Sequence, residues 1–444
     1  MSATGGTQDR ARAARILVRI LYRGKTTDQS FGPVGDDGED PVGMTATSPM
    51  LQELVLGTLR YYFCLEPLIA RQLDKPLRSK DLDLRCLMLV GAYQLHYMRV
   101  PDHAAIFETV NACRALRKPW ARSLVNAVLR QVAKSSPDER SFGLPAWWLE
   151  RLRNDYPDRA DALAAATLER APMALRVNLA RGTASAYRER LHAAGATAHP
   201  GWHPETLILD RPLPVRQLPG HKEGLVSVQD TGAQLAAPLL AAAAPTRVLD
   251  ACAAPGGKLF HLAERLPDAM LVGIERSEPR FRHLGEEARR LGHEQVHLVL
   301  GDATTDWIGA DLPATYDAIL LDAPCTGSGT LRRHPDIKVL RRSEDLAGYV
   351  AVQGALLRTL WNRLAPGGTL LYCTCSVFHE ENDGVIADFL AATPDAEPAP
   401  VALPTGVPTV HGWQLLTLPA PADGDDMTVD GFYFARMTRR EKAS

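Results

Sequence analysis

Apolar residues recur at helical spacing along most of the first third of the chain, and almost nothing there alternates as a strand does. An apolar residue every three or four positions marks one buried face of a helix. This pattern predicts helices over residues 10–23, 51–72, 84–97, 102–113 and 121–133. Asp102 is expected to be the N-cap of the fourth helix. A Gly- and Asp-rich stretch at 31–43 is expected to form a loop. We therefore expect a separate all-α domain that ends near residue 140.

The pattern becomes mixed between residues 145 and 240. Helical spacing occurs at 147–156, 158–170 and 184–194, and short apolar runs at 174–179 and 206–209 predict strands. We expect a small linking subdomain of α/β type here, and its sequence contains no motif with an identifiable chemistry.

From residue 245 onward, predicted strands and helices alternate. Short, uniformly apolar runs predict strands at 247–251, 270–275, 296–301, 316–322 and 369–372, with helices between them. Such alternation is typical of a parallel sheet that is covered by helices on both faces. The predicted fold class is thus a Rossmann-like α/β domain with a doubly wound, mostly parallel sheet at 241–444. It follows a linking subdomain at 141–240 and an all-α domain at 1–140.

Charge changes this picture little. The net charge of −2 does not by itself suggest a nucleic-acid partner, although a balanced total can conceal a basic face. Two basic groups are present, and taken alone each is more typical of a solvated helix face. The first consists of Arg114, Arg117, Lys118, Arg122 and Arg130, and the second of Arg332, Arg333, His334, Lys338, Arg341 and Arg342.

The seven scattered cysteines are odd in number, which favours reduced thiols over a disulfide framework and predicts a cytoplasmic protein. Residues 1–10 are polar and lack the apolar core of a secretory signal. No run of 18 apolar residues is present, so we expect no membrane span.

A Gly-Gly turn follows the first predicted strand of the α/β domain. Gly256 and Gly257 let a ligand approach the backbone closely, and the following helix offers free N–H groups. The spacing matches neither GxGxxG nor the GxxxxGK[ST] phosphate loop, and alone it indicates only an ordinary turn. Glu275 and Asp302 end the next two strands, where carboxylates can meet ribose hydroxyls and an adenine amino group. The three strand ends together favour a nucleoside ligand.

Two thiols follow the last two predicted strands, Cys325 in the run DAPC and Cys375 in the run TCS. Adjacent parallel strands would bring both thiols into one crevice. A thiolate that adds to C6 of cytosine turns the ring into an enamine, and C5 can then attack a methyl group. Asp322 is placed to hydrogen-bond N3 of the base, which helps the addition. The Pro-Cys motif of DNA cytosine methyltransferases would select Cys325 as the nucleophile, so both thiols remain candidates at this point.

The other cysteines of this domain have plainer interpretations. Cys252 and Cys373 lie at strand ends and are expected to be small packing residues. Cys373-x-Cys375 has no second pair at ligand spacing, so no metal site is expected. The pair is not CxxC either, which argues against a redox motif.

Three runs resemble a known family. DACAAPGGK at 250–258, DAPCTGSG at 322–329 and TCSV at 374–377 are similar to the motifs of the Nol/Nop/Sun RNA 5-methylcytosine methyltransferases. Within that family, RRHPDIK at 332–338 resembles the bacterial members that act on small-subunit (16S) ribosomal RNA. The helical first third is similar to the RNA-binding antitermination factor NusB, most clearly in VPDHAAIFETVNACR and LVNAVLR. The resemblance covers nearly the whole chain and implies an rRNA (cytosine-C5)-methyltransferase that uses S-adenosylmethionine.

The resemblance also implies roles for individual residues. The cofactor loop falls on Cys252, Ala253, Ala254, Pro255, Gly256, Gly257 and Lys258. The ribose carboxylate falls on Glu275, the adenine-side carboxylate on Asp302, and the acid beside both cofactor and cytosine on Asp322. The resemblance selects Cys375 as the nucleophile and Cys325 as the product-release cysteine, with Lys258 as a further catalytic residue. Arg332, Arg333, His334 and Lys338 are expected to contact RNA.

Two positions depart from the family pattern. Glu275 stands where the wider family usually has aspartate, and its longer side chain reaches farther toward the ribose. Cys373 stands where serine is frequent, and this third thiol complicates any experiment that relies on cysteine reactivity.

The expected partner is small-subunit ribosomal RNA. We expect the chain to act as a monomer and to have no membrane partner. Three other functions compete with this one. The chain would be a binding protein if its catalytic half were inert, which the intact Asp322, Cys325 and Cys375 argue against. It would be an enzyme for transfer RNA or another RNA if the NusB-like part had a different target. A small-molecule methyltransferase would need neither the helical part nor two thiols.

Overall fold

The computed structural model describes residues 3–31, 48–305, 312–419 and 428–441. The chain forms two compact units. Unit 1 comprises residues 1–170 together with 331–343, and unit 2 comprises 171–330 together with 344–444. The predicted loop at 31–43 lies outside the described residues except for Phe31, which ends a short helix.

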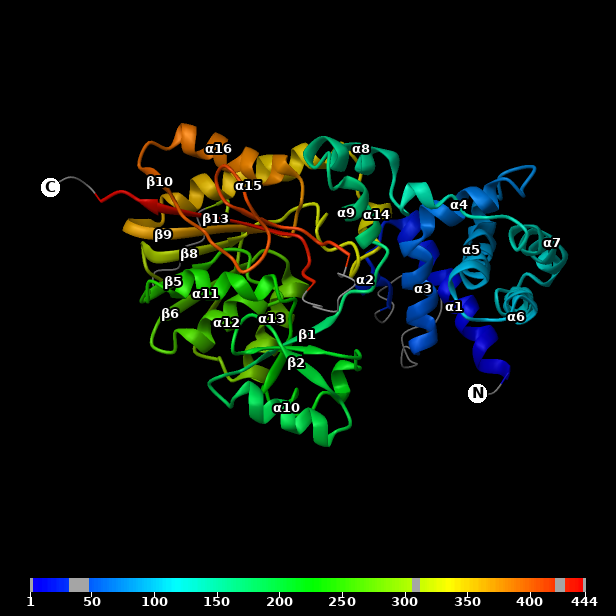
Figure 1. Ribbon diagram of the computed structural model, residues 1–444, viewed down its shortest axis with the longest axis horizontal. Coiled ribbons are helices and arrows are strands. Elements are labelled where there is room, and N and C mark those ends of the chain that lie inside the picture. The colour runs from blue at the N-terminus through cyan, green and yellow to red at the C-terminus, as the bar shows by residue number, and fades with distance from the viewer. Residues whose placement is uncertain (1–2, 32–47, 306–311, 420–427, 442–444) are drawn as a thin grey trace. The chain divides into compact units, whose positions relative to one another are not determined.

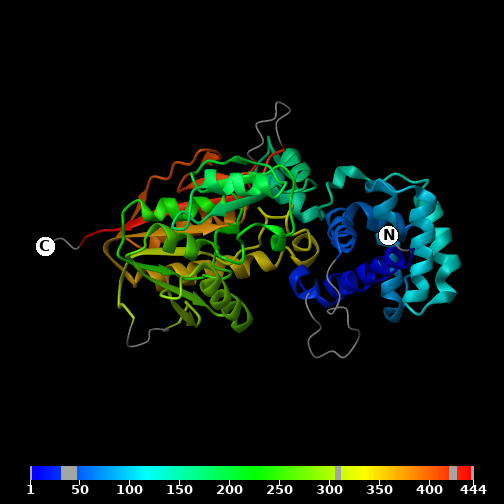
Figure 2. The ribbon, with the colours of Figure 1, turned by 90° about the horizontal axis from the view of Figure 1, so that it is seen from below.

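Unit 1 is built from helices throughout its described residues (Figures 1 and 2). They are α1 (Ala3–Arg23), α2 (Thr27–Phe31), α3 (Pro49–Arg60), α4 (Tyr62–Ala70), α5 (Leu82–Tyr97), α6 (Asp102–Ala115), α7 (Arg122–Val132), α8 (Ala146–Asp155), α9 (Ala160–Ala166) and α14 (Ile337–Leu340). The predicted all-α character is confirmed. Two details were wrong. The helix expected at 51–72 is divided at Tyr61 into α3 and α4, and Asp102 is the first residue of α6, with Pro101 at the cap position.

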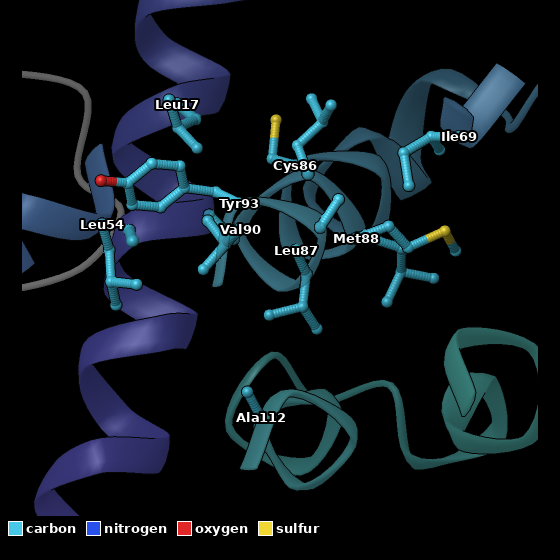
Figure 3. Packing of buried hydrophobic residues seen from close by; sticks show 14 of the residues in the cluster. Leu17, Leu54, Ile69, Cys86, Leu87, Met88, Val90, Tyr93 and Ala112 are labelled. Atoms are coloured by element: carbon cyan, nitrogen blue, oxygen red, sulfur yellow. The ribbon is translucent and has the colours of Figure 1, made fainter. Parts of the chain in front are cut away.

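Helix α5 lies at the centre of unit 1 and packs against α1, α3, α4, α6 and α7. Its middle part, residues 86–93, consists of apolar and aromatic residues and glycine and is buried on every side, as expected of a helix surrounded by others. Figure 3 shows Leu87, Met88 and Val90 pointing away from α5 in different directions, among side chains such as Leu17 of α1 and Leu54 of α3. These labelled side chains are buried, so burial of apolar surface is the main force that holds the bundle together.

Unit 2 contains two sheets. The smaller has the order β2-β3-β1-β4 and is antiparallel. Its strands are β1 (Met173–Val177), β2 (Ala198–Pro200), β3 (Thr206–Leu209) and β4 (Val226–Val228), with α10 (Ala184–Ala193) packed against β2 and β3. The predictions of strands near 174–179 and 206–209 and of a helix at 184–194 are confirmed.

The larger sheet has the order β11-β12-β13-β9-β8-β5-β6-β7, with β10 paired to β13. The parallel strands are β5 (Arg247–Asp250), β6 (Met270–Glu275), β7 (His297–Leu300), β8 (Tyr316–Asp322) and β9 (Leu364–Thr374). The other strands are β10 (Ala396–Ala399), β11 (Val407–Pro408), β12 (Trp413–Leu415) and β13 (Phe432–Arg439), and they pair antiparallel. The doubly wound, mostly parallel core is confirmed, whereas the antiparallel strands at the C-terminal end were not predicted.

Helices cover both faces of the larger sheet (Figure 1). Helices α11 (Ala236–Ala241), α12 (Gly257–Arg265) and α13 (Glu278–Leu291) lie on one face, and α15 (Asp345–Trp361) and α16 (Asp383–Ala392) on the other. The strand order reverses at β5, which has β6 on one side and β8 on the other. Ligands of open α/β sheets bind outside the carboxyl ends of the strands at such a reversal.

Candidate active site

A cavity of about 230 Å³ lies at the carboxyl ends of the parallel strands. Its wall contains seven residues that the sequence predicted for the site: Cys252, Ala254, Glu275, Asp302, Asp322, Cys325 and Cys375. They follow five different strands, and the strand order brings their ends to one edge of the sheet. The remaining predicted loop residues, Ala253, Pro255, Gly256, Gly257 and Lys258, belong to the same turn and helix start but do not line the cavity wall.

The Gly-Gly turn has the backbone that its sequence demands. Gly256 has φ +105°, a backbone conformation that residues other than glycine rarely adopt. A Cβ atom there would lie 2.4 Å from the ring of Phe260. The turn can therefore pass close to the first turn of α12 only with glycine at this position.

Two carboxylates occupy the next strand ends. Glu275 is 3% exposed, and its carboxylate accepts a hydrogen bond from the Ser277 amide (2.8 Å) and pairs with Arg280 (3.4 Å). The carboxylate of Asp302 accepts two hydrogen bonds from Thr304, one from its backbone amide (2.9 Å) and one from its hydroxyl (2.7 Å). These two bonds lower the pKa of Asp302. Both side chains are thus held in fixed orientations at the wall of the cavity.

Lys258 and Asp322 form a close ion pair, with Nζ 2.6 Å from Oδ2. Burial is the largest single influence and lowers the pKa of Lys258. The Asp322 carboxylate, together with Cys373 and Cys375, raises it by more, so the pKa is raised overall and the ammonium persists. The ammonium also lies 5.3 Å from the centre of the Phe432 ring. Asp250 at the end of β5 is buried, and burial followed by the charge of Asp322 raises its pKa to about 7. Lys258 is therefore the cation that pairs with Asp322 and partly offsets the charge of two neighbouring carboxyl groups.

The two predicted thiols face each other, with 3.4 Å between the Sγ atoms of Cys325 and Cys375. Strands β8 and β9 are parallel neighbours, and Asp322 lies opposite Cys373 in their register. The prediction that adjacent strands bring both thiols into one crevice is confirmed. The hydrogen bond with Cys375, followed by burial, raises the pKa of Cys325 well above its usual range. The protonated form of Cys325 is therefore favoured.

Cys252 and Cys373 are the other two cysteines of unit 2. Burial raises the pKa of both thiols. Cys373 is fully buried, with Sγ 3.5 Å from Oδ1 of Asp322, and Cys252 packs at the edge of a core cluster. Neither environment favours the thiolate that nucleophilic attack requires.

Sequence reasoning missed several residues around the cavity. Arg276, Arg280 and Thr304 line it beside the two carboxylates, and Val352 and Leu356 of α15 add an apolar wall. The spacing of Val352 and Leu356 by four positions places them on one face of a helix, which is a signal the sequence contains. No local pattern distinguishes Arg280 from a surface arginine.

The smaller sheet of unit 2 supports the cofactor-loop region, although its sequence showed no chemistry. The guanidinium of Arg176 on β1 is buried, pairs with Glu264 of α12 (2.8 Å) and donates to the carbonyl of Gly257 (2.5 Å). Glu205, just before β3, contacts His261 (2.9 Å) and Arg265 (2.8 Å) of the same helix. These buried polar contacts fix α12, and with it Lys258.

The residues predicted to contact RNA belong to unit 1 and differ in exposure. His334 is exposed and Arg333 is half-buried, whereas Arg332 and Lys338 are buried. The ammonium of Lys338 donates to the carbonyl of Arg60 and to the hydroxyl of Thr167, each at 3.2 Å. The carbonyl of Arg332 accepts a hydrogen bond from the guanidinium of Arg60 (2.8 Å). For Lys338 the structure thus indicates a role inside the helical unit, because an ammonium with these partners presents no charge at a surface.

Replacement of Lys338 by methionine is expected to remove a pH dependence of stability. Burial lowers the pKa of Lys338 to about 7, whereas an unfolded lysine titrates near 10.4. Between these values the unfolded chain binds the additional proton, so the wild type gains stability as the pH rises from about 7 to about 10, by on the order of a few kcal/mol. Lys338→Met lacks this gain. Urea unfolding of both proteins at pH 7 and pH 9.5 measures it, and parallel pH dependences would contradict the prediction.

Three successive parts of the chain match models of known protein families. Residues 237–438 match the family model of 16S rRNA methyltransferase RsmB/F, residues 7–134 the NusB family, and residues 144–216 the ferredoxin-like domain of RsmF/B-like methyltransferases. The ribosomal RNA small subunit methyltransferase B of Pasteurella multocida is 40% identical over 97% of this chain and 96% of its own length.

Solved structures resemble the chain as well. The crystal structure of PH0851 covers 100% of this chain and 99% of its own, with TM-score 0.80 and 22% identity, and it shows the fold alone. A methyltransferase homolog protein from Pyrococcus horikoshii covers 68% of this chain and 97% of its own, with TM-score 0.57 and 27% identity. Among the described helices, none is both long and apolar enough to cross a membrane.

Proposed function

Because the chain belongs to the RsmB/F family of 16S rRNA methyltransferases, we propose that it transfers a methyl group from S-adenosylmethionine to C5 of a cytosine in small-subunit rRNA. The main support for this proposal is the distance of 3.4 Å between the sulfur atoms of Cys325 and Cys375 at the wall of the cavity. Asp322, which pairs with Lys258, lines the same cavity. A methyltransferase that acts on an already nucleophilic atom needs no thiol, whereas C5 of cytosine needs prior addition at C6.

The strand ends fit S-adenosylmethionine, which supplies an electrophilic methyl group on a positively charged sulfur. Glu275 and Asp302 are held at the wall by Ser277, Arg280 and Thr304. We assign Glu275 to the ribose hydroxyls and Asp302 to the adenine side, with the turn at 252–258 contacting the ligand through Cys252 and Ala254, which line the cavity. The negative side chains around the cavity, Asp322 included, suit a positively charged ligand.

Cys375 is the proposed nucleophile. Its partner Cys325 has a raised pKa and lies 3.4 Å away, so the Cys325 thiol can donate a hydrogen bond to the Cys375 sulfur. Lys258 lies close enough to interact electrostatically with Cys375. The Cys375 thiolate adds to C6 of cytosine, C5 then takes the methyl group, and Asp322 hydrogen-bonds the base near N3. In release, a solvent base takes the proton from C5, the Sγ–C6 bond breaks, and its electron pair returns to sulfur.

Cys325 is proposed to assist that release. A departing thiolate is a poor leaving group when it is not solvated, and a thiol in contact with it stabilises the developing charge. Because Cys325 lies against Cys375 and remains protonated, it can donate to the departing sulfur without taking part in the attack.

The proposal is tested first by methyl transfer from labelled S-adenosylmethionine to protein-free 16S rRNA, followed by nucleoside analysis. We expect label in 5-methylcytidine. Label in another nucleoside would contradict the C5 assignment. Transfer to a different RNA alone would favour the alternative substrates, and cofactor binding without transfer to any RNA would point to a preassembled particle or a scaffold.

Arg333 is proposed to contact an RNA phosphate, since chemistry on a base requires the base to leave its stack while the backbone is held. Arg333→Ala is expected to weaken RNA binding by about three- to ten-fold and to reduce the slope of log K against log salt by roughly 0.7–0.9, with cofactor affinity unchanged. Arg188→Ala, which removes an exposed arginine of α10, is the matched control. Normal RNA affinity of Arg333→Ala at physiological salt would remove this residue from the interface.

A further inference from the structure

A buried glutamate joins the two thiol-bearing loops. Glu381 ends the short 3-10 helix His379–Glu381, two residues before the first residue of α16, and is 0% exposed. Its carboxylate accepts hydrogen bonds from the amide (2.8 Å) and hydroxyl (2.5 Å) of Thr326 and from the hydroxyl of Ser376 (2.6 Å). Thr326 follows Cys325 and Ser376 follows Cys375 in the sequence. One carboxylate therefore binds the residue that comes after each thiol.

Hydrogen bonds hold the backbone of the Cys325 loop both before and after Cys325. Gln353 of α15 donates through one amide nitrogen to the carbonyl of Pro324 (2.9 Å) and to Glu381 (3.2 Å). The peptide units before and after Cys325 are thus held by Gln353 and Glu381. Four donors around a buried carboxylate compensate much of the cost of its burial, so the cluster forms one connected network.

The Cys375 loop has additional supports. The carbonyl of Cys375 accepts a hydrogen bond from the amide of Gly329 (2.9 Å), and the hydroxyl of Ser376 also contacts that of Ser328 (2.8 Å). Asn382 donates to the carbonyl of Ser376 (3.0 Å). Ser328 and Gly329 belong to the segment that carries Cys325, so of these supports only Asn382 anchors the Cys375 loop independently. Loss of the Glu381 carboxylate would therefore remove two contacts of Thr326, next to Cys325, and leave the Cys375 loop anchored by Asn382.

We propose that Glu381 is a positioning residue that holds Cys325 against Cys375 and thereby sets the rate of product release. The assignment of attack to Cys375 and release to Cys325 rests on the proposed function, whereas the claim about position does not. Without Glu381, Cys375 still adds to the base, but Cys325 spends less time within hydrogen-bond distance of the departing sulfur. The negative charge of Glu381 also contributes to keeping Cys325 protonated, after the contact with Cys375 and burial.

The position is tested by oxidative cross-linking of the full-length protein. Diamide takes up two electrons and two protons from a pair of neighbouring thiols and leaves a disulfide, which requires the two sulfurs to come within about 2.05 Å. Peptide mapping by mass spectrometry follows the Cys325–Cys375 cross-link in a Cys373→Ser background, which excludes the third thiol. We expect Glu381→Gln to form this cross-link about five- to ten-fold more slowly than the parent. Asp388→Asn, an exposed acid of α16, should match the parent.

The effect on release is tested by trapping the protein–RNA adduct on denaturing gels. Glu381→Gln is expected to accumulate adduct during turnover, with steady-state methylation reduced about ten-fold and single-turnover methyl transfer reduced less. Thr326→Val, which removes one donor to Glu381, should change both readouts in the same direction but less. It also provides the test if Glu381→Gln does not fold.

The outcomes separate the two proposals. Cross-linking of Glu381→Gln at the parent rate would overturn the positioning role whatever the methylation assays give. Slower cross-linking with normal adduct levels, while Cys325→Ala does accumulate adduct, would overturn the link to release. If Cys325→Ala also failed to accumulate adduct, the thiol roles of the proposed function would fail, and slower cross-linking would still support Glu381 as the residue that holds the thiols together.

Discussion

Replacement of Cys375 by alanine is expected to abolish methyl transfer and the covalent protein–RNA adduct together, whereas Cys325→Ala should let the adduct accumulate. Without the Cys375 sulfur nothing adds to C6, and C5 remains too weak a nucleophile to accept a methyl group. Loss of a covalent nucleophile typically lowers kcat by several orders of magnitude. Loss of Cys325 leaves the attacking sulfur in place but removes the thiol 3.4 Å from it that assists its departure.

The measurement is a denaturing gel of protein mixed with labelled rRNA and S-adenosylmethionine. Cys373→Ser is the matched control. It removes a thiol from β9, the strand that Cys375 follows, and the serine hydroxyl can still donate a hydrogen bond to Asp322. It should form and release the adduct as the wild type does. Adduct formation by Cys375→Ala and its absence in Cys325→Ala would exchange the two roles.

Lys258→Met is expected to lower kcat about 10²- to 10⁴-fold while changing the Kd of S-adenosylmethionine less than ten-fold. The ammonium is 2.6 Å from Asp322 and neutralises a site that also contains the buried Asp250. Without it, the pKa of Asp250 rises further above about 7. Asp322 also loses the partner that fixes its orientation in the cavity.

Single-turnover methyl transfer and equilibrium cofactor binding separate these two effects. Lys222→Met removes an exposed lysine of unit 2 and should behave as the wild type does. Lys258→Arg should recover part of the rate, since a guanidinium can pair with Asp322. A Lys258→Met protein with normal kcat would reduce the ion pair to a structural contact.

The parallel core and the thiol pair could be predicted because each depends on a local signal. Short apolar runs that end on Asp250, Glu275 and Asp322 mark buried parallel strands, and the carboxyl ends of such strands meet at one edge. Adjacent strands β8 and β9 then bring Cys325 to Cys375. The all-α first third was predictable for the same reason, since a helix buries a face that repeats within a few residues.

The parts that escaped prediction depend on partners far away in the sequence. The basic run at 332–342 resembles a solvated face, yet Lys338 is bound by Arg60 and Thr167, which lie more than 170 residues earlier. Arg176 of the smaller sheet contacts Gly257 across 81 positions, and no spacing rule connects them. Glu381 is one of several acids after the TCS run, and only its burial distinguishes it from its neighbour Glu380. Charge patterns do not reveal which charges tertiary structure will bury.

The assignment of residues 331–343 to unit 1 has a consequence for synthesis on the ribosome. The first part of that unit is complete at residue 170, but Lys338 and Asp336, which bind Arg60, Thr167 and the amide of Thr27, are translated about 160 residues later. At about 5–20 residues per second, the helices wait roughly 10–30 s for this segment. The N-terminal bundle is therefore completed only after four of the five parallel strands of the larger sheet, β5 to β8, have been made, and neither unit can be cut away or exchanged between relatives as one continuous piece of sequence.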